Sequence, residues 1–311
     1  MIVVSGEALM DVFAAGETAT GVMLDARIGG SPLNVAAGLA RLRQPVAFFG
    51  ALSSGFLGDR LLKCLHDEGI DTQCTLRVDA PTTLGLVGLD ARGVPSYAFY
   101  GQGAADRQLP PDAMSRVPAA QAFHFGSYAM VVEPVAATQR ALVEREHRRS
   151  VIAYDPNIRL NVEPELHRWR DTLQWMLPRT HVLKVSDEDL ALLFPGAEAG
   201  ELATEWIAAG VALVVVTRGG EGASAWTAAH RASAAPVKVN VVDTVGAGDT
   251  FQAALLTALA ERGLLSASEL RQLSATALDE VLRFATRAAA ITCSRRGADL
   301  PRRHELAPAA G

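Results

Sequence analysis

The segment Asp243-Thr-Val-Gly-Ala-Gly-Asp249-Thr-Phe251 predicts a glycine-rich turn that joins a strand to a helix. The β-branched run Val237–Val242 before it is typical of a strand. From Thr250 onward apolar side chains recur at helical spacing, and Gly263 can end that helix. A strand, a turn and a helix in this order form the repeating unit of α/β proteins.

Strand-like and helix-like segments alternate along the rest of the chain. Ser31 and Pro32 predict the N-cap and first turn of a helix that runs to about Arg43, and Ser186 with Asp189 resembles a capping box. We therefore expect one domain over residues 1–311, built as a doubly wound, mostly parallel α/β sheet flanked by helices. The apolar runs that predict strands covered on both faces are Ile2–Ser5, Pro45–Gly50, Val151–Asp155, His181–Val185 and Ala212–Thr217.

Two segments, at about residues 12–28 and 76–104, do not follow this alternation. They are richer in Thr, Gly and alternating apolar residues, as in Leu84–Leu89 and Tyr97–Tyr100. This pattern indicates short strands that project from the main sheet. We interpret them as a small β lid over a cleft, and the alternative is that they are edge strands of the main sheet.

The chemistry of the glycine-rich turn points to an anion. Small residues let the backbone approach a ligand closely, and the N-terminus of the following helix presents free N–H groups to it. Asp249 at the edge of such a site would repel a phosphate, so its presence needs a reason. A carboxylate there can accept the proton of a hydroxyl group that attacks phosphorus. The alternative is that Asp249 only caps the helix.

Composition excludes several other classes of protein. The formal net charge of −5 gives no general attraction to nucleic acid or to an anionic membrane. The three cysteines include no CxxC pair, which favours reduced thiols and a cytoplasmic protein. We see no secretory signal and no apolar run long enough to span a bilayer. No Walker P-loop is present, because no lysine follows a glycine.

Several motifs together resemble the PfkB, or ribokinase-like, family of carbohydrate kinases. The segment Asp243–Phe251 is similar to the C-terminal signature of that family, and Gly29-Gly-Ser-Pro-Leu-Asn-Val-Ala36 is similar to its N-terminal signature. Asp155-Pro-Asn-Ile-Arg159 and Thr217-Arg-Gly-Gly-Glu-Gly222 resemble further family blocks in the family order. The resemblance runs from about Gly6 to Gly297. It implies a phosphotransferase that uses ATP and Mg²⁺.

The resemblance also implies a role for each site residue. Asp249 would be the catalytic base, and the turn of Gly246, Ala247 and Gly248, with the Asp249 amide, would form the anion hole. The implied sugar contacts are Asp11, Gly30, Asn34, Arg107 and Arg159; the implied nucleotide contacts are Ser186, Thr217, Gly219 and Gly222; and Asp243 would help to bind a monovalent cation such as K⁺.

Alternatives stay open for some of these residues. Asp11 can instead cap a turn, Asn34 can be an ordinary polar residue of an early helical turn, and Arg107 and Arg159 can be surface charges. The family often has Asn and Glu near the phosphates, where this chain has Ser186 and Asp189.

The residues of these motifs are more similar to those of fructokinases, especially bacterial ones, than to those of ribokinases. We therefore expect transfer of the γ-phosphoryl group to fructose, giving fructose 6-phosphate. The alternatives are a kinase for 2-keto-3-deoxygluconate, for another ketose or for ribose, or a non-catalytic sugar or nucleotide sensor. We expect a sugar and ATP as the only partners, with no nucleic acid or membrane, and a homodimer formed through the lid.

Overall fold

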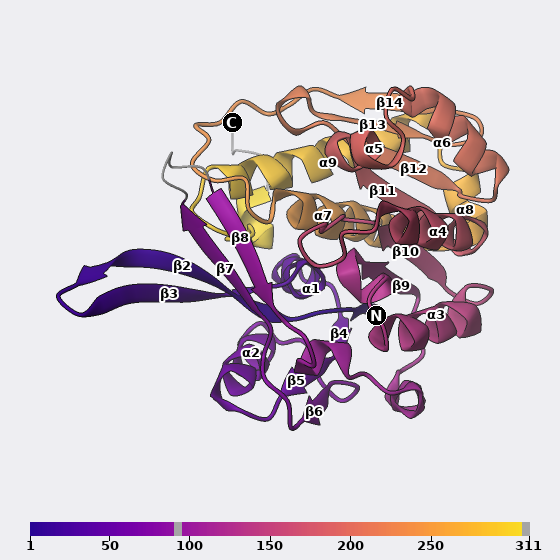
Figure 1. Cartoon of the computed structure of the whole chain (residues 1–311). Coiled ribbons are helices and arrows are strands. Elements are labelled where there is room, and N and C mark those ends of the chain that lie inside the picture. Colours follow the sequence, from indigo (N-terminus) through magenta and orange to yellow (C-terminus); the bar gives the residue numbers. More distant parts are fainter. Residues whose placement is uncertain (90–94, 307–311) are drawn as a thin grey trace.

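The computed structural model describes residues 1–89 and 95–306 of the chain, and these form a central sheet covered by helices on both faces (Figure 1). The eight strands of this sheet follow the order β14-β13-β12-β11-β10-β9-β1-β4. Pairing is parallel from β4 to β12 and antiparallel for β13 and β14. The strands are β1 (Ile2–Ser5), β4 (Val46–Phe49), β9 (Ala122–Gly126), β10 (Val151–Asp155), β11 (Val182–Ser186), β12 (Leu213–Thr217), β13 (Ala223–Trp226) and β14 (Arg231–Ala234).

Two hydrophobic clusters cover the two faces of the sheet. One face packs against α1, α2, α7, α8 and α9, and the other against α3, α4, α5 and α6. The expected fold class is confirmed. The helices are α1 (Ser31–Arg41), α2 (Phe56–Asp67), α3 (Val135–Glu146), α4 (Leu166–Met176), α5 (Asp187–Leu193), α6 (Ala199–Ala208), α7 (Ala247–Glu261), α8 (Ala267–Arg271) and α9 (Ala275–Cys293). Short 3₁₀ turns are η1 (Ala105–Arg107), η2 (Pro111–Arg116), η3 (Ser127–Met130), η4 (Leu177–Arg179), η5 (Gly219–Glu221) and η6 (Arg303–Leu306).

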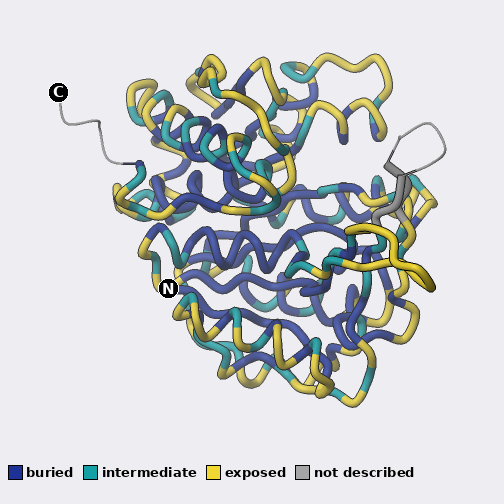
Figure 2. Tube along the Cα trace, turned by 90° about the vertical axis from the view of Figure 1, so that its left-hand side faces the viewer, coloured by how far each residue is buried: buried dark blue, intermediate teal, exposed yellow. Residues whose placement is uncertain are grey.

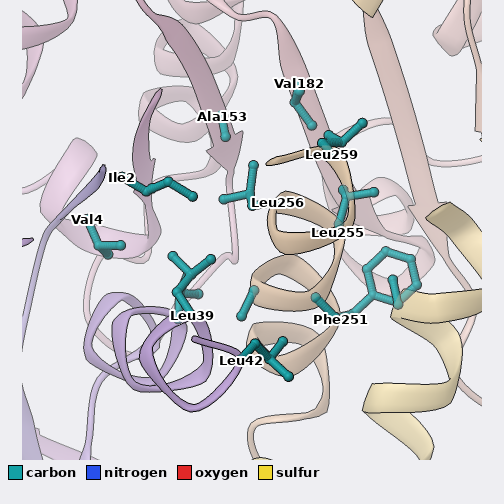
Figure 3. Close-up of a cluster of buried hydrophobic side chains, with 14 of the residues drawn as sticks. Ile2, Val4, Leu39, Leu42, Ala153, Val182, Phe251, Leu255, Leu256 and Leu259 are labelled. Atoms are coloured by element: carbon teal, nitrogen blue, oxygen red, sulfur yellow. The ribbon is translucent and has the colours of Figure 1, made fainter. Parts of the chain in front are cut away.

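Helix α7 is the central helix of its layer, between α1 and α9. Phe251, Leu255 and Leu256 of α7 lie with Leu39 of α1 and Ala153 of β10 in one apolar cluster (Figure 3). Burial on all sides fixes the N-terminus of α7 firmly relative to the carboxyl ends of the strands. Ligands of open α/β sheets bind at that edge.

A second, four-stranded sheet stands apart from the main one, in the order β3-β2-β7-β8. It consists of β2 (Leu9–Thr18), β3 (Gly21–Gly29), β7 (Leu84–Leu89) and β8 (Pro95–Tyr100), and β5 (Ala51–Ser53) pairs with β6 (Leu76–Val78) in a small sheet of its own. The β2–β3 hairpin extends away from the helical layers (Figure 1), and most of its outer part is exposed (Figure 2). These strands are therefore not edge strands of the main sheet.

Two local predictions were wrong. The run Val237–Val242 is not a strand: residues 235–246 form no regular element, and Val241 and Val242 are exposed. The β-branched side chains of Val237, Val239 and Val241 line a pocket instead. The N-cap of α1 is Gly30, one residue earlier than predicted, and the helix ends at Arg41.

The capping role of Ser186 is confirmed, because its hydroxyl accepts a hydrogen bond of 3.0 Å from the Asp189 N–H group. No helix within the described ranges is both long and apolar enough to cross a bilayer.

Candidate active site

Asp249 is the centre of the polar groups at the carboxyl edge of the sheet. It lies in the first turn of α7 and is almost completely buried. Its Oδ1 accepts a hydrogen bond of 2.6 Å from the Ser31 hydroxyl, and its Oδ2 accepts one of 2.9 Å from Asn34 Nδ2. Both donors come from the first turn of α1, so two helices hold one carboxylate. A carboxylate oxygen has two lone pairs, and each one here keeps a lone pair for a further hydroxyl group.

Opposing effects act on the pKa of Asp249. Burial raises it above the usual value for an aspartate, whereas the hydrogen bonds from Ser31 and Asn34 and the nearby Lys184 and Arg159 lower it. A buried carboxylate with partners of this kind can accept a proton from a substrate group. The alternative that Asp249 is only a helix cap is disfavoured, because its side-chain bonds go to another helix.

The turn before Asp249 forms the expected concave backbone. Gly246 is the N-cap of α7 and has a φ of 77°. The Ala247 N–H group donates to the Thr244 carbonyl at 3.1 Å, so it is engaged within the turn. Within residues 1–89 and 95–306, the N–H groups of Gly248 and Asp249 have no hydrogen-bond partner. Two of the three expected amides are therefore open to an anion.

A pocket of about 230 Å³ adjoins this turn. The segment between β14 and α7, together with α9, supplies most of its walls, which are mainly apolar. Thr217, Gly219 and Gly222, predicted as nucleotide contacts, lie in its wall beside Ala247 and Gly248. The pocket therefore joins an apolar cavity to an anion site.

Asp11 lies on β2 of the second sheet, opposite Arg27 of β3 and Gly85 of β7. A Cβ atom at Gly29 would meet Asp11 Oδ2 at 2.2 Å, and one at Gly85 would meet Oδ1 at 2.9 Å. Burial raises the pKa of Asp11 to about 6, helped by the charge of Asp249 and opposed by Arg159. The two carboxylates, one from β2 of the second sheet and one from α7, thus face a common space.

Gly30 and Arg159 border the same space. Gly30 has a φ of 103°, and a Cβ atom there would lie 2.8 Å from the Glu7 carbonyl oxygen. Arg159 follows β10, is exposed and lowers the pKa values of Glu7, Asp11 and Asp249. It is therefore an exposed cation close to these carboxyl groups.

Three predicted site residues have structural partners. Arg107 belongs to η1 and packs over the Tyr128 ring, 5.6 Å from the ring centroid. The Ser186 side chain caps α5. The Asp243 carboxylate accepts N–H bonds from Val245 at 3.0 Å and from Gly297 at 2.8 Å, which ties the turn before α7 to the segment after α9.

Sequence reasoning missed two buried groups. Lys184 of β11 lies inside the protein and donates from Nζ to Asp155 Oδ2 at 2.7 Å. Glu7, after β1, is buried, its Oε2 atom has no hydrogen-bond partner among the residues that the structure describes, and burial raises its pKa to about 8. Lys184 is a basic residue within a run that predicts a buried strand, and that interruption was the available signal for it; Glu7 follows the predicted strand Ile2–Ser5, and no pattern marked it.

The chain matches the pfkB family of carbohydrate kinases over residues 1–305. It belongs to this family. It is 34% identical over 279 residues to a fructokinase of Rhizobium leguminosarum bv. trifolii, an alignment that covers 89% of this chain and 85% of the relative. A probable fructokinase-4 of Arabidopsis thaliana is 33% identical over 309 residues, which cover 96% of this chain and 92% of that protein.

Solved structures agree with this assignment. A fructokinase from Xylella fastidiosa with bound ATP superposes with a TM-score of 0.87 at 27% identity, covering 98% of this chain and 96% of the other. A fructokinase double mutant from Vibrio cholerae O395, in a form bound to fructose, ADP and potassium ion, gives a TM-score of 0.83 at 26% identity with the same coverage. The resemblance seen in the motifs is confirmed. As a pfkB carbohydrate kinase, the chain is a phosphotransferase with a sugar hydroxyl group as acceptor.

Proposed function

We propose that this kinase transfers the γ-phosphoryl group of ATP to O6 of fructose, with Asp249 as the general base. The observation that carries this proposal is the buried Asp249 carboxylate, which Ser31 and Asn34 hold at the N-terminus of α7. The carboxylate accepts the proton of the sugar hydroxyl as that oxygen attacks phosphorus. The amides of Gly248 and Asp249, and the positive end of the α7 dipole, stabilise charge on the transferred group.

The residues around the turn fit ATP. The apolar pocket lined by Val239, Phe251 and Ala289 suits the base, and its wall at Gly248 adjoins the open amides that suit a phosphate chain. We assign Thr217, Gly219 and Gly222 to nucleotide binding on the same ground.

The cations that we propose fit the same edge of the site. Mg²⁺ is usually held by one or two carboxylates together with phosphates and waters. Asp189 offers such a carboxylate: it is buried, and the charges of Lys184 and Arg159 act on it. A monovalent cation such as K⁺ fits Asp243, whose oxygens each keep a lone pair beside their N–H bonds.

On the sugar side we assign Asp11, Gly30, Asn34, Arg107 and Arg159 to binding. Asp11 offers acceptors for sugar hydroxyls from the second sheet, and Arg159 offers an exposed cation close to that carboxyl group. We propose that the second sheet acts as a lid that closes over the sugar and excludes water, which would otherwise accept the phosphoryl group.

The choice of fructose is supported by the fructokinase relatives and tested by a substrate panel. ADP release is measured with ATP and Mg²⁺ on fructose, ribose, 2-keto-3-deoxygluconate, tagatose and adenosine. We expect the highest kcat/KM on fructose, and higher activity in K⁺ than in Na⁺ buffer. A clear preference for another sugar would replace fructose and keep the mechanism. Binding of ATP and sugar without any ADP release would favour a sensor.

We also propose a homodimer formed through the second sheet. Val22 and Leu24 of β3 are 60% and 57% exposed and lie on the same face of the projecting hairpin. Two exposed apolar side chains on one strand face can be covered by the same face of a second copy. Sedimentation equilibrium should give a dimer that Leu24→Asp converts to a monomer, and a monomeric wild type would refute the proposal.

A further inference from the structure

Lys184 occupies a position that a salt bridge alone does not explain. It lies in the middle of β11, where its neighbours Leu183 and Val185 are fully buried, and is itself only 4% exposed. Its side chain projects from the same face of the sheet as Val182, toward α7. A buried ion pair stabilises a fold little compared with apolar residues of similar size. The retention of Lys184 and Asp155 inside the core therefore calls for another reason.

Gly248 supplies a second, independent observation. It lies in the first turn of α7, and glycine is a poorer helix former than alanine. Its φ is not in the left-handed region, so backbone conformation does not require a glycine. A Cβ atom there would meet one group within 4 Å, the Lys184 ammonium nitrogen at 3.1 Å. The missing side chain of Gly248 makes room for this ammonium group at the anion site.

We propose that Lys184 is an electrostatic residue of the phosphoryl-transfer site, whose buried ammonium group, held by Asp155 beside Gly248, supplies positive charge to the anion hole and to Asp249. This inference rests on the proposed function. Two open amides carry only partial charges, whereas the bound phosphates and the transferred group carry full negative charges. In a buried setting a fixed ammonium group is little screened and needs no reorganisation during the reaction.

The charges around Asp249 fit this role. Arg159, after β10, is exposed, and Lys184 is the buried cation that lowers the pKa of Asp249. Asp11, from β2, faces the same space and acts in the opposite direction, because Asp249 and Asp11 repel each other. Together with the hydrogen bonds from Ser31 and Asn34, Lys184 therefore opposes the rise in the pKa of Asp249 that burial causes. The buried imidazole of His124 on β9 does not compete, because burial lowers its pKa to about 3.

The experiment separates this role from mere pairing with Asp155. Lys184→Gln keeps a donor for Asp155 but no charge, and the double variant Lys184→Met/Asp155→Asn removes both charges together. Thermal melting identifies the variants that fold. The matched control is Lys63→Met, which removes an exposed lysine paired with Asp67 on α2.

We expect both Lys184 variants to lower kcat at least tenfold with little change in the KM for fructose, and Lys63→Met to behave as wild type. The acidic limb of the pH profile of kcat/KM should move to higher pH by about one unit. An opposite charge near a carboxyl group lowers its pKa by about 1–3 units, and the variants remove such a charge from beside Asp249. A folded double variant with wild-type kcat and a wild-type acidic limb would overturn the inference.

A binding measurement does not depend on turnover. Calorimetric titration with inorganic tripolyphosphate should show at least tenfold weaker binding to the double variant than to wild type. If the wild-type protein phosphorylates no sugar but binds tripolyphosphate, and the double variant loses this binding, the proposed function is refuted and Lys184 stays an anion-site residue. Equal binding to wild type and double variant would refute the role of Lys184, whatever the substrate.

Discussion

Asp249→Asn should lower kcat for fructose by about 10²- to 10⁴-fold, the usual contribution of a positioned general base. An amide cannot accept the hydroxyl proton, but it has the same shape as the carboxylate. Its oxygen can accept the bond from Asn34 Nδ2, and its NH₂ group can donate to the Ser31 hydroxyl, which rotates to accept. Binding of ATP should therefore change little. Initial rates at saturating ATP and fructose, with calorimetric ATP binding, check both statements.

The same substitution should not destabilise the protein. Burial raises the pKa of Asp249, so the folded state bears an unfavourable desolvation of this charge, which a neutral asparagine removes. The matched control is Asp279→Asn on α9, which removes a half-exposed aspartate paired with Arg283 and should keep the wild-type rate. Full activity in a correctly folded Asp249→Asn variant would show that Asp249 is a helix cap and that another group accepts the proton.

Most of the fold could be predicted because its signals are local. The strands β1, β10 and β12 cross a core that is buried on both faces, so each appears in the sequence as a mainly apolar run. The run Val237–Val242 is also rich in valine but is not a strand: no strand of the described residues pairs with it, and Val237, Val239 and Val241 line a pocket instead. The β propensity of a residue describes how well its side chain fits a sheet. It does not depend on whether a partner strand is present.

Residues of the site could be predicted from the sequence only where they belong to a recognisable motif. Asp249, Gly248 and Asn34 lie in motifs, and the structure brings the three together. Lys184 lies in no motif that we weighed, and its importance depends on Gly248, 64 positions away in the sequence, coming to rest against it. A pairing of this kind exists only after α7 has packed on the sheet. A charged residue inside an apolar strand was the one local signal of it.

Gly246→Ala should have the second largest effect, a fall in kcat of about 10²- to 10³-fold, as is usual when an oxyanion-hole donor is lost. Gly246 has a φ of 77°, which costs a residue with a side chain about 1–2 kcal/mol. Its new Cβ atom would also lie 2.7 Å from Ala298 Cβ and 3.0 Å from Ala298 Cα. The turn must move to relieve this contact, and the amides of Gly248 and Asp249 move with it. Steady-state kinetics on fructose measure the loss.

Gly263→Ala is the matched control for this prediction, at the other end of α7. Gly263 has a φ of 70°, close to that of Gly246, but a Cβ atom there would meet nothing within 4 Å. Both variants should therefore lose a similar free energy of unfolding from backbone strain, as measured in urea, with a further loss in Gly246→Ala from the Ala298 contact. Only Gly246→Ala should lose activity, because only its strain lies at the anion hole. Equal kcat values in the two variants would show that the turn tolerates displacement, and that the amides of Gly248 and Asp249 do not bind the transferred phosphoryl group.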